Sequence, residues 1–187
     1  MHAGQIGFYF DQTRCTGCYA CVIACRDWHD IRDTKVQWRS VIAHEWGKYP
    51  DVGLAYASLS CMHCSQPACR DVCPVSAIRK RDSDGVVLVD RDLCLGGKAC
   101  GKCREACPYE IPQFGTGDDD RMQKCTFCVD RIDTGEQPVC VLACPMYALD
   151  WGPIDELRRK YGTVQHIYGF SLASEAQPSI VLKFQSE

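Results

Sequence analysis

The sequence predicts a loop-rich α+β fold with short strands and short helices. Three observations support this fold class. Sixteen of the 187 residues are Cys, the cysteines fall into groups that recur along the chain, and the segments rich in β-favouring residues between these groups are short. Without its cysteines the chain has a modest stock of apolar residues for its length, so we expect bound inorganic groups to replace part of a hydrophobic core.

The expected regular elements are few and lie mainly between the cysteine groups. They are, in chain order, a strand at 7–11, a helix at 21–29, a strand or hairpin arm at 36–46, strands at 54–60 and 86–89, a helix at 152–162 and a strand at 180–184. Asp84-Gly85 predicts a turn before the strand at 86–89.

The last helix has recognisable boundaries and an apolar face. Pro153 lies near its start and Gly162 at its end, as is typical of helix termini. Ile154, Leu157 and Tyr161 share one face, which we expect to pack in the core and not to form a partner groove.

All sixteen cysteines belong to one of four groups, and every group ends in Cys-x3-Cys. The groups are Cys15-x2-Cys18-x2-Cys21-x3-Cys25, Cys61-x2-Cys64-x4-Cys69-x3-Cys73, Cys94-x5-Cys100-x2-Cys103-x3-Cys107 and Cys125-x2-Cys128-x11-Cys140-x3-Cys144. Pro follows the last Cys of the second, third and fourth groups. Such an internal repeat indicates one small structural unit that is used several times.

The first group has the ligand spacing of [4Fe–4S] clusters in two-cluster ferredoxins, apart from Arg26 in place of Pro. Cys-x2-Cys-x2-Cys wraps three thiolates around a cubane, and a short helical turn carries the fourth Cys toward another cluster. Pro after that Cys suits the first position of a helical turn. We therefore predict four [4Fe–4S] clusters on sixteen cysteines, and a function in electron transfer.

Zinc is the main alternative, because Cys-x2-Cys pairs also form zinc knuckles, and it would make the protein a zinc-stabilised interaction module. Zinc sites join two separated pairs, whereas the first group has three evenly spaced cysteines, so the spacing favours iron–sulfur clusters. Disulfides are disfavoured because no secretory signal is evident. The Cys-x2-Cys-His motif of haem attachment and the Cys-x3-Cys-x2-Cys motif of radical enzymes that cleave S-adenosylmethionine are absent.

Charge and targeting signals restrict the kinds of partner and the cellular location that we expect. A net charge of −3 argues against a nucleic-acid surface, and Asp118-Asp119-Asp120 is typical of a solvated loop.

Residues 1–7 lack the features of a signal peptide, and no stretch approaches the roughly 18 apolar residues of a membrane-spanning helix. We expect a chain that is made in the cytoplasm and becomes membrane-associated through partners, or is exported to the periplasm already folded with a signal-bearing partner.

Several residue strings match a known family. They are Cys-Thr-Gly-Cys at 15–18, Cys-Met-His-Cys at 61–64, Ala-Cys-Pro-Tyr at 106–109, Lys-Cys-Thr-Phe-Cys at 124–128 and the segment at 148–157. Together with the order of the four groups, they resemble the iron–sulfur subunit of dimethyl sulfoxide reductase-like molybdenum oxidoreductases, from Gly7 to about Phe184. Related subunits accompany polysulfide, thiosulfate and nitrate reductases and formate dehydrogenases.

The resemblance implies that ligands are exchanged between groups. The implied ligand sets are Cys15, Cys18, Cys21 and Cys144 for cluster 1; Cys61, Cys64, Cys69 and Cys107 for cluster 2; Cys73, Cys94, Cys100 and Cys103 for cluster 3; and Cys25, Cys125, Cys128 and Cys140 for cluster 4. It also implies two nested bacterial-ferredoxin-like modules. The outer module comprises residues 1–58 and 110–187, with a C-terminal extension, and the inner module comprises residues 59–109.

The third group departs from the family pattern. The family usually has two residues between the first two cysteines of this group, whereas here residues 95–99 separate Cys94 from Cys100. Gly96 and Gly97 allow a loop that bulges and returns, so we expect Cys94 to bind. If Cys94 is displaced, cluster 3 is [3Fe–4S].

The resemblance implies a non-catalytic subunit. It would carry electrons between a catalytic subunit that bears a molybdenum or tungsten pterin and a quinone-linked membrane anchor or other redox partner. The alternative is a stand-alone polyferredoxin, or the electron wire of a hydrogenase, formate dehydrogenase or tungsten aldehyde oxidoreductase. The sequence has no evident nucleophile–base motif or Gly-rich phosphate loop.

Cations beside the cysteines are candidates for tuning the clusters, because a nearby positive charge stabilises the reduced, more negative state. They are Arg14, Arg26, Lys98, Lys102, Arg104, Lys124 and Arg131. The alternative for each is a solvated charge beside a loop.

Two other residue types need interpretation. His63 lies between Cys61 and Cys64, and we expect it to be a neighbour of a cluster and not a ligand of the Rieske kind. The tryptophans are expected to pack in the core rather than to form a partner surface. They are Trp28, Trp38, Trp46 and Trp151.

Overall fold

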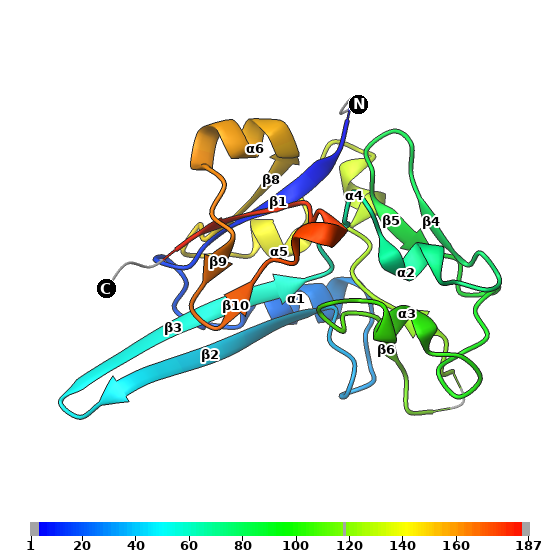
Figure 1. Ribbon diagram of the computed structural model, residues 1–187, viewed down its shortest axis with the longest axis horizontal. Helices are drawn as coiled ribbons and strands as arrows, with labels where there is room; N and C mark the ends of the chain where they lie inside the picture. The colour runs from blue at the N-terminus through cyan, green and yellow to red at the C-terminus, as the bar shows by residue number, and fades with distance from the viewer. Residues whose placement is uncertain (1–3, 118, 185–187) are drawn as a thin grey trace.

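The computed structural model describes residues 4–117 and 119–184 (Figure 1). Residues 1–3, which entered the expectation about export, Asp118 of the acidic run, and residues 185–187 at the end of the predicted outer module lie outside the described residues. At the centre is a three-stranded sheet of order β11-β1-β8. Strand β1 (Ile6–Asp11) runs parallel to β11 (Ile180–Lys183) and antiparallel to β8 (Leu149–Pro153). The two ends of the chain are therefore joined in one sheet.

The two faces of this sheet are covered differently, because side chains alternate along a strand. Phe8, Phe10 and Leu182 face the main core. The other face carries helix α6 (Ile154–Tyr161). A small apolar cluster joins them, made of Tyr9, Ile154, Leu157, Val181 and Tyr161. The prediction that the apolar face of this helix packs in the core is confirmed.

Helix α6 begins two residues later than the sequence predicts. Gly152 and Pro153 belong to strand β8, where they pair with Gly7 and Ile6 of β1. The sequence analysis missed this strand, because five residues take a strand conformation only when a partner strand lies beside them.

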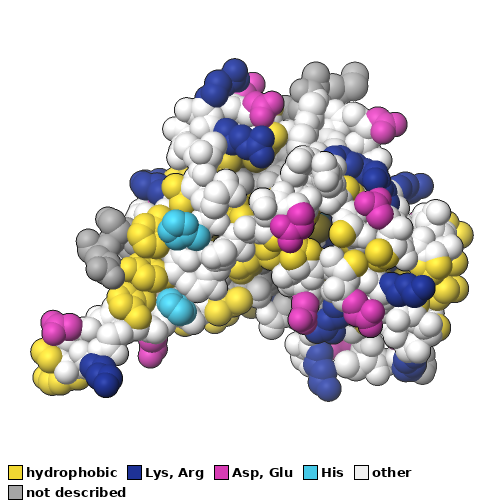
Figure 2. All heavy atoms as spheres, in the orientation of Figure 1, with side chains coloured by type: hydrophobic (Ala, Val, Ile, Leu, Met, Phe, Trp, Pro, Cys, Tyr) yellow, Lys and Arg dark blue, Asp and Glu magenta, His cyan; other side chains and the backbone are white. Residues whose placement is uncertain are grey.

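The longest element is a hairpin arm that projects from the body (Figure 1). Strands β2 (Arg39–Lys48) and β3 (Asp51–Ser60) pair antiparallel over ten residues each, from Arg39 opposite Ser60 to Lys48 opposite Asp51. The Trp46 ring stacks on Tyr168 at 3.9 Å between centroids. Figure 2 shows hydrophobic side chains gathered along this arm. The strand or hairpin arm predicted at 36–46 is thus confirmed as β2, with its bounds shifted toward the C-terminus, and the strand predicted at 54–60 begins earlier, at Asp51.

Short helices lie at every Cys-x3-Cys repeat, as the spacing predicts. Helix α1 (Ala20–Trp28) contains Cys21 and Cys25, whereas the other three helices contain the first Cys and end before the second. These helices are α2 (Ala68–Asp71), α3 (Lys102–Glu105) and α5 (Val139–Leu142). The sequence repeat is therefore also a repeat of local structure.

The remaining elements are small. They are β4 (Ile78–Lys80), β5 (Val87–Val89), β6 (Gln113–Phe114), β7 (Met122–Gln123), α4 (Val129–Ile132), β9 (His166–Ile167), β10 (Phe170–Ser171) and the 3-10 turn η1 (Ser174–Ala176). A second core, separate from the main one, forms where Ile78, Val87 and Met122 meet Cys103. Among the described residues, no helix is long and apolar enough to cross a membrane.

Candidate iron–sulfur sites

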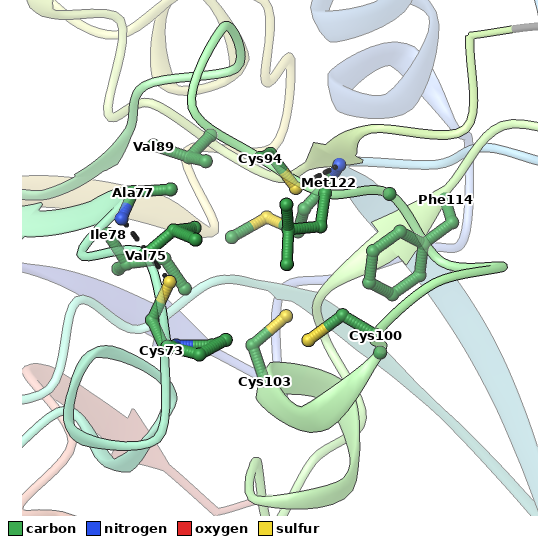
Figure 3. A pocket seen from close by; sticks show the side chains of 14 residues that line it. Cys73, Val75, Ala77, Ile78, Val89, Cys94, Cys100, Cys103, Phe114 and Met122 are labelled. Carbon is green, nitrogen blue, oxygen red and sulfur yellow. Dashed lines mark hydrogen bonds between the residues drawn. The ribbon is translucent and has the colours of Figure 1, made fainter.

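One cavity collects four cysteines from the second and third groups (Figure 3). They are Cys73, Cys94, Cys100 and Cys103. The rest of the lining is almost entirely apolar, with Phe114 and Met122 contributed by strands β6 and β7. Two backbone N–H groups point at sulfur here: Ala77 donates to Cys73 Sγ and Met122 to Cys94 Sγ, each at 3.3 Å.

The long spacing after Cys94 forms a closed loop. The backbone N–H of Gly97 donates to the carbonyl oxygen of Asp120 at 2.9 Å, and that of Lys98 donates to Asp120 Oδ2 at 2.8 Å. Gly96 has φ +85°, a left-handed conformation that favours glycine, and its carbonyl accepts from Cys100 N–H at 3.0 Å. The loop therefore returns the backbone to the same cavity, with Cys94 on its border.

Two further cavities repeat this arrangement. One is bordered by Cys15, Cys18, Cys21 and Cys144. The other is bordered by Cys61, Cys64, Cys69 and Cys107. The three cavities are of nearly equal size, with about 350, 320 and 350 Å³ of space free of atoms, open mouths included. Equal size is expected of sites that hold the same inorganic group.

The last four cysteines are neighbours, and Cys125 and Cys140 among them belong to the main core. Cys25, Cys125, Cys128 and Cys140 are all buried. Burial, and after it repulsion from Cys125, Cys140 and Cys128, raises the pKa of Cys25 well above its ordinary value. These mutual effects identify the four thiols as neighbours, although they come from the first and the fourth groups.

The thiols are difficult to ionise without a cation. Burial is the first cause in each case; it raises the pKa of Cys64, Cys69 and Cys128 to about 12 and that of Cys103 and Cys125 to about 11. Repulsion between neighbouring thiolates adds to this effect. A metal removes the penalty, because it binds thiolates and displaces their protons.

A cubane fits these sites better than a single ion does. Within residues 4–117 and 119–184, no three His, Cys, Asp or Glu side chains converge on a point where one metal ion would bind. The cysteines instead border wider spaces. N–H donors to sulfur are also present at Cys125, from Phe127, and at Cys144, from Ala148, each at 3.3 Å, as thiolate ligands of clusters require.

His63 provides a second test of fit. It is fully buried, and its Nδ1 accepts the backbone N–H of Val87 at 3.0 Å, so the proton of the neutral ring is on Nε2. Nε2 has no hydrogen-bond partner among the described residues. A buried donor without an acceptor is costly. His63 does not border a cysteine cavity, so the structure agrees with a neighbour rather than a ligand.

The flanking cations divide into several kinds. Arg26 donates to the backbone carbonyl groups of Val36, Ile31 and Asp33, and therefore holds a loop. Arg131 pairs with Glu136 and lies over the Trp28 ring. Lys124 is different, because it is 2 % exposed and its Nζ donates to the carbonyl oxygens of Val87 and Cys125.

A second buried cation escaped the sequence analysis. Arg39 begins strand β2, far in sequence from its nearest cysteines, and is 3 % exposed. It donates to Ser58 Oγ at 3.1 Å and to Ser60 Oγ at 2.9 Å. Pairing of β2 with β3 brings these three residues together, and no signal in the sequence alone connects them to a cluster.

The tryptophans only partly follow the prediction. Trp38 and Trp151 pack against the main core. Trp28 is 47 % exposed and donates through Nε1 to Asp130 at 2.6 Å, and Trp46 lies on the hairpin arm. Trp28 and Trp46 therefore pack at the surface, on neighbouring side chains.

Comparison with known proteins agrees with this arrangement. The family described as a 4Fe-4S dicluster domain matches residues 52–154, and a 4Fe-4S binding domain matches residues 8–26. The B subunit of anaerobic dimethyl sulfoxide reductase is 42% identical to this protein in two species. In Haemophilus influenzae the match spans 188 residues, 96% of this chain and 89% of that subunit. In Escherichia coli it spans 187 residues, 96% of this chain and 88% of that subunit.

A more distant relative belongs to a different enzyme. The formate dehydrogenase-O iron-sulfur subunit of Escherichia coli is 32% identical over 169 residues, which cover 82% of this chain and 55% of that protein. These similarities confirm the predicted family and an electron-transfer role in place of a catalytic one, and they disfavour a zinc-stabilised module. The protein belongs to the family of [4Fe–4S] electron-transfer subunits that includes the B subunit of anaerobic dimethyl sulfoxide reductase.

Proposed function

We propose that this protein binds four [4Fe–4S] clusters and conducts electrons through them between a catalytic subunit bearing a molybdenum or tungsten pterin and a second redox partner. The supporting observation is the composition of the cavities. Each of three cavities is bordered by three cysteines of one group and the last cysteine of another. That exchange of the fourth cysteine is the ligand pattern of two-cluster ferredoxins.

The proposed ligand sets are those implied by the family resemblance. They are Cys15, Cys18, Cys21 and Cys144 for cluster 1; Cys61, Cys64, Cys69 and Cys107 for cluster 2; Cys73, Cys94, Cys100 and Cys103 for cluster 3; and Cys25, Cys125, Cys128 and Cys140 for cluster 4. When bound, such a cluster accepts and gives up one electron. The protein holds the thiolates, donates N–H groups to sulfur and excludes water from the apolar cavities.

The order of the sites follows from the shared helices. Helix α1 carries Cys21 of set 1 and Cys25 of set 4, one turn apart. Cys69 of set 2 in helix α2 is followed after that helix by Cys73 of set 3, and Cys103 of set 3 in helix α3 is followed by Cys107 of set 2. Cys125 of set 4 and Cys61 of set 2 are close enough that Cys61 contributes, after burial, to the raised pKa of Cys125. These contacts support a linear order of clusters 1, 4, 2 and 3.

The two ends of this order are the proposed contact points for partners. Cys18 is an exposed cysteine of set 1. Tyr19 and Met146 are exposed apolar residues that border that site, and Ile23, Leu142 and Tyr147, close in sequence to cysteines of sets 1 and 4, are exposed as well. At the other end, Val72, Leu93 and Leu95 are exposed next to the cysteines of set 3. Exposed apolar patches beside a cofactor favour docking of a redox partner.

The partners are proposed from the relatives. The B subunit of dimethyl sulfoxide reductase is more similar to this protein than the formate dehydrogenase subunit is, at 42% against 32% identity. This favours a catalytic partner of the former class, with a membrane anchor as the second partner. We propose that the protein acts at the membrane through these partners, on the cytoplasmic side or after export with the catalytic subunit.

Iron and acid-labile sulfide analysis of anaerobically purified protein tests the cluster content, together with EPR of reduced and oxidised samples. We expect about sixteen of each per protein molecule, given four cubanes, and magnetically coupled signals after reduction. About fifteen irons and a signal in the oxidised sample would mean that cluster 3 is [3Fe–4S]. Zinc without sulfide would refute the proposal.

Purification of the native protein tests the partners. Co-purification with a pterin-bearing subunit is the expected result. A free monomer that holds four clusters would instead support the stand-alone polyferredoxin.

A further inference from the structure

Arg39 has an unusual environment for a charged side chain. The guanidinium is buried, and it has no carboxylate partner among residues 4–117 and 119–184. Its hydrogen bonds go to two hydroxyl groups, and its other neighbour is the Phe8 ring, 5.0 Å from Cζ. Arginine does not lose its proton in proteins. A buried charge therefore needs an opposite charge nearby.

The nearest groups that can be negative are cysteines of two ligand sets. Arg39 donates to Ser58 Oγ, and Ser58 Oγ lies 3.4 Å from Cys21 Sγ of set 1. Because Ser58 accepts from Arg39, its own proton is free to point at the Cys21 sulfur. Cys125 and Cys140 of set 4 lie in the main core with Phe8, over whose ring the Arg39 guanidinium is placed. The electrostatic neighbours of Arg39 include three cysteines of set 4. They are Cys25, Cys125 and Cys140.

We propose that Arg39 is a tuning residue that serves as the shared counter-ion of clusters 1 and 4 and raises the reduction potential of both. The proposal rests on the proposed function, since it requires both clusters to be present. Each cluster gains one electron on reduction and so becomes more negative. A fixed positive charge in the low-dielectric core stabilises that state more than the oxidised one. No bond forms or breaks, and no proton is transferred.

Lys124 is a second buried cation, and it lies beside the cysteines of set 2. It is also buried and also has no carboxylate partner in the described part of the chain. Its charge acts on Cys64 and Cys69 of set 2, where it lowers pKa values that burial raises. Lys124 thus lies beside set 2, although its hydrogen bond to the carbonyl oxygen of Cys125 also connects it to set 4. Cluster 1 is therefore the control when Lys124 is replaced, and clusters 2 and 3 are the controls when Arg39 is replaced.

The test is an EPR-monitored redox titration of the full-length protein in complex with its partners. In Arg39→Gln, the equilibrium constants for one-electron reduction of clusters 1 and 4 should fall at least about tenfold, which corresponds to about 59 mV. The equilibrium constants for reduction of clusters 2 and 3 should change less than about threefold. Lys124→Gln should lower the reduction potential of cluster 2 and leave that of cluster 1 unchanged. Variants that lack one cluster, Cys18→Ser and Cys128→Ser, assign the signals of clusters 1 and 4.

Two further variants separate charge from hydrogen bonding. Arg39→Lys keeps the charge but loses the fork to both serines, so it should recover most of the potential of cluster 4. Ser58→Ala removes the hydroxyl group beside Cys21, so it should lower the reduction potential of cluster 1 and leave the reduction potential of cluster 4 unchanged. These two variants keep the proposal testable if Arg39→Gln does not assemble.

Arg14→Gln is the matched control for loss of a positive charge. Arg14 is the sequence neighbour of Cys15, but it is exposed, so water and salt screen its charge. All potentials should stay within about threefold of the original equilibrium constants. If Arg39→Gln behaves like Arg14→Gln, or lowers all four potentials equally, the proposal is wrong. Iron and sulfide content, measured on every variant, distinguishes this failure from absence of the clusters, which would refute the proposed function itself.

Discussion

Replacement of Gly96 by Ala should make cluster 3 lose iron faster in oxygen. Gly96 lies in the loop between Cys94 and Cys100 and has φ +85°. A Cβ atom at this position would meet Oδ1 of Asp120, the carboxylate that holds the loop through Lys98 N–H. The substitution therefore strains the backbone and also displaces the side chain that closes the loop.

The size of the effect follows from two contributions. The left-handed conformation costs an L-residue about 1–2 kcal/mol. Displacement of Asp120 loses a partly exposed hydrogen bond worth about 0.5–1.5 kcal/mol. The sum is about 1.5–3.5 kcal/mol, and since each 1.4 kcal/mol is a factor of about ten, the open loop should be roughly 10–300 times more populated. If opening is fast, iron loss through the open loop accelerates by the same factor.

The assay follows the EPR signal of the oxidised sample, and the iron content, after exposure of anaerobic protein to limited oxygen. The [3Fe–4S] signal should appear roughly 10–300 times faster in Gly96→Ala than in the unmodified protein, as the opening factor requires. Gly117→Ala is the control, because no atom lies within 4 Å of the Cβ that it would add. Conversion of Gly96→Ala at the unmodified rate, or equal acceleration by Gly117→Ala, would refute the reasoning.

Three other predictions concern stability. Burial opposes ionisation of Asp11, but hydrogen bonds from Thr13 and Lys183 outweigh it and hold its pKa below the ordinary value. Asp11→Asn should therefore lower the free energy of unfolding by about 1–3 kcal/mol at pH 7. Because ionised Asp11 stabilises the fold only above its folded pKa, this loss should shrink below about pH 4. Denaturation at several pH values measures the loss, and a loss independent of pH would contradict the prediction. Trp46→Ala removes the stacking on Tyr168 and should lower the local stability of the hairpin arm by about 2 kcal/mol. Amide hydrogen exchange at residues 39–60 should then be faster, whereas Trp46→Phe should largely preserve the protection of the arm. Removal of iron by a chelator should strongly lower the midpoint temperature of thermal unfolding, because the buried thiols then regain protons and the cavities lose their contents. An unchanged midpoint in calorimetry would show that the fold does not depend on clusters.

Cysteine spacing alone predicted iron–sulfur binding, which the family matches confirm. Cys-x3-Cys places two thiols about one helical turn apart, and this local geometry appears at Cys21 and Cys25 as predicted. The strand at the N-terminus and the apolar face of the last helix were also predictable, because a repeating pattern of side chains defines each of them.

Cysteine spacing did not show which groups lie together; the family resemblance implied it, and three cavities of the structure bring together the same cysteines. Only the tertiary structure showed which of the candidate cations is buried, and that Arg39 is a further one. Strand β8 exists because β1 lies beside it, and the hairpin register brings Arg39 to Ser58 and Ser60. Sequence analysis instead selected Arg26, which neighbours a cysteine in the sequence but donates to the carbonyl groups of a loop. Local geometry is encoded by residues a few positions apart. The electrostatic environment of a buried site depends on contacts between residues distant in sequence, and spacing along the chain contains no information about those contacts.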